Sequence, residues 1–585
     1  MRVIYNTKYN VIDKNMSDCQ MGARKAKGCR NNIFIVNAII HDVMKGRKKK
    51  AVNLQIYDYA QMFDSIDLQQ AISDIYDAGV DDDNLVLLNK ANQEVHMAVK
   101  SATGLTDRQV LKDIVLQGDT WGSLLASVQV DSIGKECQEA GYGYFYMDIL
   151  PIGMLGLVDD LVGVTEAGYK AQQMNTFINV KTAEKSLQFG ASKCKSLLIG
   201  KNKNGVLNSD LVVDSWTVEY VDNLNTGDYD LIETFGGKVA IENTDKHKYL
   251  GFVISNTGDN MVNINSMKNK SIGIIRQIYN RLESLSLRRY YFECAMVFMN
   301  IMLRSSILYA AETYHNLKEN ELREIERIEE TFMRKILNTS KGCPIVQLYL
   351  TLGQIPARFA IMRMRLSFLQ CILKEDEESM ISNVLHLQLK NPTRGDWAST
   401  CVDNLRQLEI TESFQEIKVM KKNTYDKMLK SRIDKIALHY LTSKQGQKGG
   451  EMLYTQIEMS EYLLPLTELD ITEKRNMFAV KNRMSHICEN FPSKQEIEVC
   501  FCGERVTMEH IYLCTELNSE KIEVSYKQIF NGYINQQIIV YKRFQKNFNK
   551  RENMKNENKK ENIPHAIAQS EPQSSGIEYC NGFNK

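Results

Sequence analysis

Three aspartates stand next to apolar segments in a pattern that could hold divalent cations. Asp58 ends the run LQIYD, and Asp159 and Asp160 lie between the two apolar arms of LGLVDDLVGV. Magnesium prefers oxygen ligands, and two divalent cations about 4 Å apart can stabilise the attacking and leaving oxygens in phosphoryl transfer. One Asp after a strand and an Asp pair in a neighbouring hairpin turn would supply such a site. Each segment is also compatible with an ordinary exposed turn, so the prediction depends on their convergence.

A second group of candidate ligands lies near the end of the chain. The segment VCFCGERVTMEHIYLC contains Cys500, Cys502, His510 and Cys514. Three thiolates and one imidazole suit tetrahedral zinc, although one residue between the first two cysteines is fewer than usual. His510 and Cys514 are four residues apart, which places them on one face of a helix. The segment predicts a structural zinc site, and the alternative is four unconnected core residues.

The aspartates need a layered scaffold, and the first 255 residues predict one. Ile33–Val43 has a helical pattern, Ala51–Tyr57 is an apolar strand, and Ile66–Ala78 is again helical. A strand–turn–strand pattern covers Gly156–Val164. This mixture of elements predicts an α/β or α+β layer domain.

From Asn263 to about Lys374 the pattern changes to long amphipathic helices. Apolar residues recur every three or four positions on one expected helix face: Leu322, Ile325, Ile328, Phe332 and Ile336. The apolar stretch Phe292–Tyr314 contains Glu293, Asn300 and Arg304, which favours a buried helix over a membrane span. Residues 375–470 are more polar and also helical, and the tail from about residue 545 is expected to be disordered.

Composition limits the function classes. The net charge of +1 does not by itself indicate a nucleic-acid binder. Two local basic runs, at residues 45–50 and 541–562, could contact phosphates or be solvated surface. The 13 cysteines are scattered and odd in number, which argues against a disulfide framework. With no signal pattern at the start, we expect an intracellular protein, in the nucleus or cytoplasm.

Five segments in order resemble the reverse transcriptases of LINE-type (non-LTR) retrotransposons. YDYAQMFDSID resembles motif A, LQGDTWGSLLASVQVD motif B, LVDD motif C, LQFGASKCKSLLIG motif D, and HKYLGFVIS the primer-grip hairpin. The resemblance spans about residues 16 to 375 and resumes at the Cys/His segment, which is similar to the family's zinc knuckle. NMSDCQMGARKAKGCRNN resembles the segment after the first fingers motifs. Only a short stretch precedes it, so the chain is expected to be an N-terminally truncated member.

The resemblance implies roles for individual residues. Asp58, Asp159 and Asp160 would bind Mg²⁺ or Mn²⁺, and Lys193 would lie near the nucleotide phosphates and protonate the pyrophosphate. Phe63 would lie under the sugar of the incoming dNTP. The other implied contacts are with nucleotide and template (Gln117, Gly118, Arg24, Lys25) and with the primer (Tyr249, Leu250, Gly251). Taken singly, Phe63 could be a core aromatic, Lys193 a surface lysine and Tyr249 an ordinary strand residue.

The implied architecture is α+β, a right-hand polymerase with an antiparallel palm sheet and helices. Its expected parts are partial fingers (1–50), palm (51–255), helical thumb (256–375), helical connector (376–490), zinc knuckle (491–520) and a disordered tail (545–585). The implied reaction is RNA-templated DNA synthesis by two-metal nucleotidyl transfer to a primer 3′-hydroxyl. The partners would be an RNA template, a DNA primer or target and dNTPs, without a membrane. The alternative is an inactive relative that only binds RNA or DNA.

Overall fold

A computed structural model describes residues 2–46, 51–102, 104–112, 115, 121–200, 211–222, 229–285, 290–339, 343, 345–445, 471 and 475. At its centre lies a five-stranded sheet made of β1 (Ala51–Tyr57), β8 (Met154–Leu157), β9 (Asp160–Glu166), β10 (Lys195–Gly200) and β13 (Glu242–Asn243). The strand order is β13-β10-β1-β9-β8. β1 is antiparallel to both neighbours, and β8 and β9 form an antiparallel hairpin. β13 runs parallel to β10, so the prediction of a purely antiparallel sheet was wrong.

Helices cover both faces of the sheet, which explains why β1 is buried along almost its whole length. Leu54 faces a core shared with α2 (Cys29–Lys45), where Phe34 is fully buried. On the other face, Gln55 donates to the Ala171 carbonyl of α7 (Tyr169–Glu184). A strand that is covered on both faces is expected to be mainly apolar, and the polar residues buried in β1, Asn53 and Gln55, are hydrogen-bonded.

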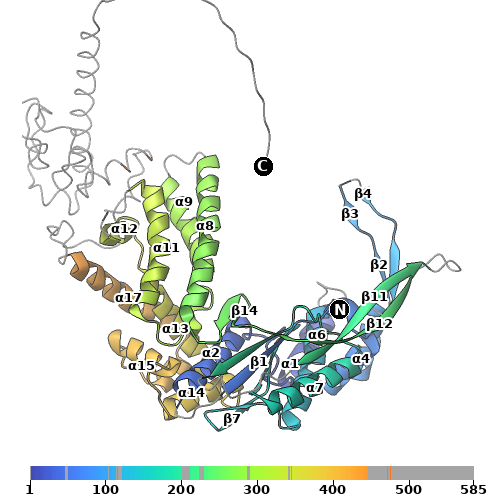
Figure 1. The fold of residues 1–585 in the computed structure, drawn as a ribbon. Coiled ribbons are helices and arrows are strands. Elements are labelled where there is room, and N and C mark those ends of the chain that lie inside the picture. Colours follow the sequence, from blue (N-terminus) through green and yellow to red (C-terminus); the bar gives the residue numbers. More distant parts are fainter. Residues whose placement is uncertain are drawn as a thin grey trace, which may run out of the picture.

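Further elements surround this layer. The remaining helices of the first half of the chain are α1 (Arg2–Asn15), α3 (Met62–Ser65), α4 (Leu68–Asp77), α5 (Asp82–Gln93) and α6 (Gly122–Glu139). The two-stranded ribbons pair β2 (Glu94–Met97) with β5 (Gln109–Lys112), β3 (Lys100–Ser101) with β4 (Gly104–Leu105), β6 (Tyr144–Tyr146) with β7 (Leu150–Ile152), β11 (Val212–Asp222) with β12 (Tyr229–Ala240), and β14 (Lys246–Tyr249) with β15 (Phe252–Ser255). Figure 1 shows the β3–β4 and β11–β12 ribbons projecting from one side of the molecule.

On the opposite side rises a group of long helices (Figure 1). These elements are α8 (Asn260–Ser284), α9 (Tyr291–Phe298), a π-helix (Met299–Arg304), α10 (Ser305–Ile307), a 3₁₀ turn (Ala311–Thr313), α11 (Glu319–Leu337), α12 (Ile345–Thr351) and α13 (Ala357–Lys374). The predicted apolar face of α11 is confirmed, because Ile325, Ile328, Phe332 and Ile336 are all buried. The single helix expected from Phe292 to Tyr314 was wrong: the segment is interrupted by the π-helix and ends in the 3₁₀ turn.

In the described part of the chain, the helices after α13 begin with one that packs against α2. They are α14 (Met380–Lys390), α15 (Trp397–Gln407), α16 (Phe414–Val419) and α17 (Lys422–Gln445). Trp397 packs edge-on against Phe34 at 5.0 Å between ring centroids, and its indole N–H donates to the Glu312 carbonyl. Residues that follow the predicted thumb therefore support the helix that supports the sheet.

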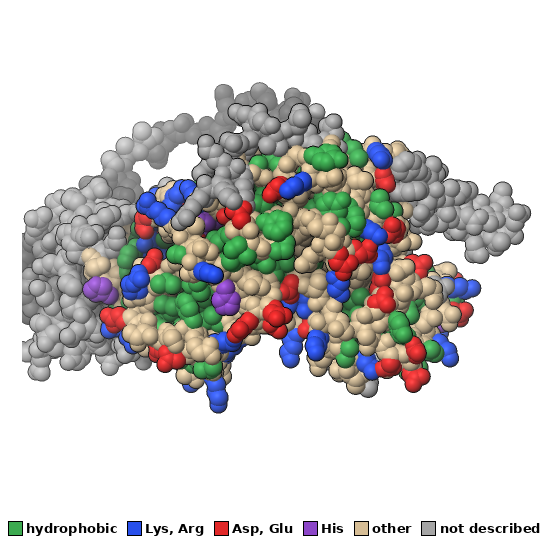
Figure 2. Space-filling model, turned by 90° about the horizontal axis from the view of Figure 1, so that it is seen from below, with side chains coloured by type: hydrophobic (Ala, Val, Ile, Leu, Met, Phe, Trp, Pro, Cys, Tyr) green, Lys and Arg blue, Asp and Glu red, His purple; other side chains and the backbone are tan. Residues whose placement is uncertain are grey.

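Three sequence predictions can be compared with the structure: the mixed surface charge, the lack of a membrane span and the α+β fold class. Figure 2 shows Lys and Arg side chains interspersed with Asp and Glu, as the near-zero net charge suggests. Among the described residues, no helix is long and apolar enough to cross a membrane. The α+β class is confirmed, whereas the division into fingers, palm, thumb and connector stays a prediction.

Candidate metal centre

Asp58 is placed by the central strand. β1 pairs with β9 so that Tyr57 is opposite Leu161, and one step further along the same register Asp58 is opposite Asp160. Tyr57 is buried and hydrogen-bonded to Gln55 and Asn175, which anchors the end of the strand. The Asp58 side chain, in contrast, is 40% exposed. The fold therefore presents this carboxylate where the strand β1 ends, on the same side of the sheet as the β8–β9 hairpin turn.

The Asp pair lies in that hairpin turn. Leu157 pairs with Asp160, so Val158 and Asp159 form a two-residue connection. Val158 has a φ of 59°, in the left-handed region that β-branched residues avoid. A residue held there costs on the order of 1–3 kcal/mol and persists only when its surroundings impose it. The turn is thus held in a defined shape by neighbouring groups.

The three carboxylates influence each other electrostatically. Partial burial raises the pKa of Asp160, and the nearby charges of Asp159 and Asp58 raise it further, although its side chain stays exposed. Crowded like charges disfavour ionisation, and a cation among them would reverse this effect. Within the described ranges, however, no three His, Cys, Asp or Glu side chains are gathered closely enough to hold a metal ion. The carboxylates share one edge of the sheet without forming a closed cage.

Lys193 lies in the loop before β10, the other strand that pairs with β1, and its side chain also reaches Asp58. Its ammonium lies 3.0 Å from the Asp58 carboxylate, and both side chains are well exposed. The loop that carries it is fixed by a hydrogen bond from the Gly190 N–H to the Asp58 carbonyl, 2.7 Å long. An exposed pair of this kind contributes less than about 1 kcal/mol to stability. Lys193 is therefore available to exchange this partner for another anion.

Gln20 and Gly22 contribute to the site in a way that the sequence did not predict. The Gln20 side chain is fully buried; its oxygen accepts from the Val158 and Gly22 N–H groups, and its amide donates to the Val158 carbonyl. Gly22 lies so close that an added Cβ would be 2.3 Å from the Val158 nitrogen. Gln20 and Gly22 together hold in place the strained turn that carries Asp159. The Gln-X-Gly spacing was the available signal, but its meaning depends on a contact between distant segments.

The predicted primer-grip residues lie near this edge. Tyr249 ends β14, and its hydroxyl accepts from the side chain of Asn32, which also donates to the Gly156 carbonyl of β8. Leu250 and Gly251 form the turn, with φ values of 47° and 83°. The turn is supported from outside by Tyr309, whose hydroxyl donates to the Leu250 carbonyl at 2.7 Å. Asn32 thus links the Tyr-Leu-Gly turn to the strand that leads to the Asp pair.

The other predicted site residues differ in how far they are buried and in what they contact. Phe63 lies on α3, partly buried against the core on the α7 face. The Arg24 side chain is only 6% exposed, and its guanidinium bonds to Asp13 and to backbone carbonyls, so its contacts here are with the protein. Lys25 is exposed. Their roles toward a nucleotide or template stay predictions.

Two sets of predicted residues lie outside the described residues. One is the Gln117–Gly118 turn of the motif B segment, and the other is the zinc set Cys500, Cys502, His510 and Cys514. The basic run after Lys45, the 541–562 run and the tail also fall there. The predictions about them remain as the sequence made them.

Comparison with known proteins does not identify a family for this chain. No protein-family model and no curated protein matches this chain. Among solved structures, a telomerase from Candida albicans in complex with a TWJ fragment of telomeric RNA matches at 9% identity and a TM-score of 0.27. The match covers 67% of this chain and 52% of the telomerase chain, so this chain spans about half of that length. At this TM-score the likeness does not define a shared fold.

Proposed function

We propose that this chain is an RNA-directed DNA polymerase of the LINE-type reverse transcriptases, adding nucleotides to a primer 3′-hydroxyl. One observation carries the proposal: Tyr57 at the end of the central strand pairs with Leu161, so Asp58 follows this pair on one strand and Asp160 of the Asp-Asp turn precedes it on the other. Three carboxylates from two separate segments thereby share one edge of the sheet. This is the arrangement that phosphoryl transfer with divalent cations needs.

The donor set fits Mg²⁺ or Mn²⁺, because it consists of carboxylate oxygens. Partial burial raises the pKa of Asp160, and repulsion from Asp159 and Asp58 raises it further. Asp58 and Asp159 would hold the metal directly, with Asp160 in support. Bound there, the ions would stabilise the charge on the primer 3′-oxygen and on the leaving phosphate oxygens. Because no closed ligand group exists in the described residues, the substrate phosphates would complete the coordination.

The surrounding side chains would orient the substrates. Lys193 would leave Asp58 and donate a proton to the departing pyrophosphate, since its ammonium is within reach of the carboxylates. Phe63 would pack under the sugar of the dNTP, and Gln117 and Gly118 would line the nucleotide and template pocket. The Tyr249–Gly251 turn would hold the primer end. Arg24 and Lys25 are proposed template or nucleotide contacts, for which Arg24 would have to exchange partners.

Outside the described residues, the proposal extends the sequence argument. Cys500, Cys502, His510 and Cys514 would bind one structural Zn²⁺ and help bind the element's RNA or its target DNA. A polymerase that copies RNA into a DNA target would act inside the cell, in the nucleus or cytoplasm.

Primer extension tests the proposal. The full chain is incubated with an RNA template, a DNA primer, dNTPs and Mg²⁺ or Mn²⁺, and product length is read on a gel. We expect extension by wild type and by the control Asp403→Ala, an exposed surface pair residue, and loss of at least about 1,000-fold with Asp58→Ala, which removes direct metal coordination. Equal extension by wild type and Asp58→Ala would reject the assignment.

A second candidate is a nucleic-acid-binding protein without catalysis. It is favoured by the ion pair in which Lys193 occupies the Asp58 carboxylate, and by the lack of a preassembled ligand group in the described part of the chain. Under this hypothesis wild type binds the RNA template in a filter-binding assay but makes no product with either metal. Extension by wild type that depends on Asp58 excludes it.

A further inference from the structure

A polar cavity lies at the far end of α2 from the aspartates. It has a volume of about 640 Å³ and is lined by α2, the end of β15, the segments before α8 and α11, and the Arg394–Gly395 loop. α2 contacts the Asp hairpin through Asn32, and His41 lies in the cavity wall. At about 1.5 Å per helical residue, the two points are separated by roughly 14 Å along the helix axis. The cavity is therefore a separate site.

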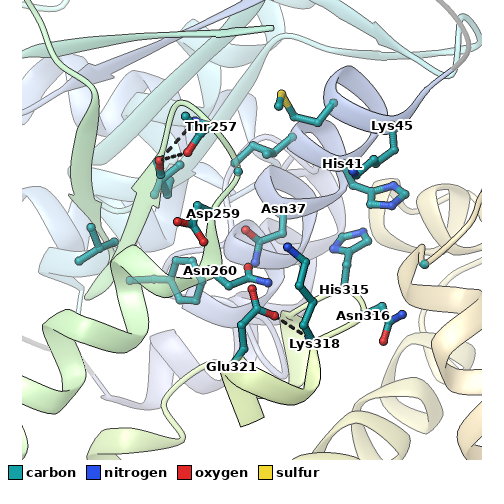
Figure 3. Close-up of a pocket in the computed structure, with 18 of the residues that line it drawn as sticks. Asn37, His41, Lys45, Thr257, Asp259, Asn260, His315, Asn316, Lys318 and Glu321 are labelled. Atoms are coloured by element: carbon teal, nitrogen blue, oxygen red, sulfur yellow. Dashed lines mark hydrogen bonds between the residues drawn. The ribbon is translucent and has the colours of Figure 1, made fainter. Parts of the chain in front are cut away.

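Two helices begin at this cavity. The N-cap of α8 is Asp259, whose carboxylate accepts from the Met261 N–H, and the N-cap of α11 is Lys318, whose N–H donates to Glu321. Both residues line the cavity, as Figure 3 shows. The first turn of a helix carries unpaired N–H groups and the positive end of its dipole. Two such ends directed at one space favour an anion there.

Cationic side chains surround the same space. Lys45, Lys318 and Arg394 are exposed, and none of them forms an ion pair within the described part of the chain. In Figure 3 Lys318 extends from the start of α11 into the cavity, towards Asn37 and Asn260. The two acids in the wall, Asp259 and Glu321, are already hydrogen-bonded to the backbone N–H groups of their own helices. The three cations outnumber the two carboxylates, so these five side chains together carry a net charge of +1.

A stacked pair of histidines completes the wall. The rings of His41 and His315 are 4.6 Å apart and nearly parallel (Figure 3). The Nε2 atom of His315 is enclosed and has no hydrogen-bond partner among the described residues. The wall thus offers neutral polar groups as well as positive charge.

We propose that this cavity binds a phosphate group carried by a nucleotide, either free or within a nucleic-acid strand. Lys318 and Arg394 would bind the phosphate oxygens, with the first turns of α8 and α11 behind them. The volume exceeds a lone phosphate and falls within the range of nucleotide-sized ligand pockets. The polar side chains Asn37, Asn260 and Asn316 would meet the sugar or base. The site extends beyond the proposed polymerase reaction, and only its strand-binding form rests on a nucleic-acid partner.

Calorimetric titration of the full chain without added Mg²⁺ or Mn²⁺ tests the site, because leaving out these ions removes any contribution from metal at the aspartates and keeps the proposed structural Zn²⁺. The probes are inorganic phosphate, uridine monophosphate and an eight-residue oligouridylate. The test variant is the double substitution Lys318→Ala, Arg394→Ala, and the control is Lys90→Ala, an exposed lysine of α5 outside the cavity. Alanine at 318 keeps the backbone N–H that caps α11.

We expect the double substitution to weaken at least one probe tenfold or more while the control leaves all Kd values unchanged. Weaker binding of phosphate and uridine monophosphate identifies a free nucleotide site. Weaker binding of the oligomer alone, with the salt slope of log Kd reduced by about 1.4 for two lost contacts, identifies a strand phosphate. Unchanged affinity for all three probes overturns the proposal. Asp58→Ala binds the probes like wild type, so failure of the polymerase assignment is seen separately.

Discussion

Replacing Gly22 with alanine should displace the Asp-Asp turn, because Gly22 packs directly against Val158 of that turn. Gly22 does not have a positive φ, so its backbone would accept alanine if there were room. The added Cβ would lie 2.3 Å from the Val158 nitrogen and 2.7 Å from Val158 Cγ2, where ordinary contact begins at 3.4 Å. The close neighbour is backbone, so the strain cannot be relieved by rotating a side chain. Segment 19–22 and the turn must separate by about 1.1 Å.

The size of the effect follows from that displacement. Misplacing reacting groups by about 1 Å can cost about 100-fold in rate, which corresponds to about 2.7 kcal/mol of transition-state stabilisation. Overfilling a packed contact also costs about 1–3 kcal/mol of folding free energy. The shift would also weaken the two hydrogen bonds between Gln20 and Val158 of the turn. We therefore expect kcat to fall about 100-fold with little change in the KM for primer.

The assay is steady-state primer extension together with urea denaturation. Gly28→Ala is the matched control, because an added Cβ there meets nothing within 4 Å and the residue lies in the same segment. If Gly22→Ala extends primer within about threefold of wild type and unfolds at the same urea concentration, the turn is not held from this side. If it loses stability but keeps its kcat, the contact is real but does not position the aspartates.

Three more substitutions have expected outcomes. Lys193→Ala should lower kcat by about 100-fold or more if this lysine is the proton donor, while the melting temperature stays within experimental error because the ion pair is exposed; an unchanged kcat would reject that role. Glu329→Ala leaves the Arg304 guanidinium without its buried partner and should reduce the free energy of unfolding in urea by about 3–5 kcal/mol; a loss below about 1 kcal/mol would contradict this. Tyr309→Phe removes the hydrogen bond to Leu250 and should raise the KM for primer several-fold at constant kcat; a lower kcat with unchanged KM would place Tyr309 elsewhere in the reaction.

The central strand and its neighbours could be predicted because their signals are local. Ala51–Tyr57 is apolar at most of its buried positions, and the structure gives β1 these same bounds. The Asp-Asp turn follows from two apolar arms that pair with each other. Neither signal says which strands are neighbours, so only the structure shows that Tyr57 pairs with Leu161, which brings the adjacent residues Asp58 and Asp160 to the same end of the sheet.

The parts that could not be predicted depend on contacts between distant segments. Gln20 looks like an ordinary polar residue until the chain brings it to Val158, 138 positions later. The apolar 292–314 segment contains a π-helix that ends at Arg304, whose side chain pairs with Glu329 of the distant helix α11. The cavity could not be foreseen either, because its walls come from four separate segments of the chain. Periodicity identifies elements, whereas a site forms where elements meet.

One helix connects the two proposed sites, and this determines how they can be separated by experiment. Near its start, α2 holds the Asp hairpin through Asn32, and near its end it supplies His41 and Lys45 to the cavity. Between these two points, Phe34 holds α2 in place by packing against Trp397 of α15 and Phe368 of α13. A change in this part of the helix would displace both ends together, because a helix moves as a rigid body over such a short length. Variants that distinguish the aspartates from the phosphate cavity must therefore lie in the walls of each site and not in the helix between them.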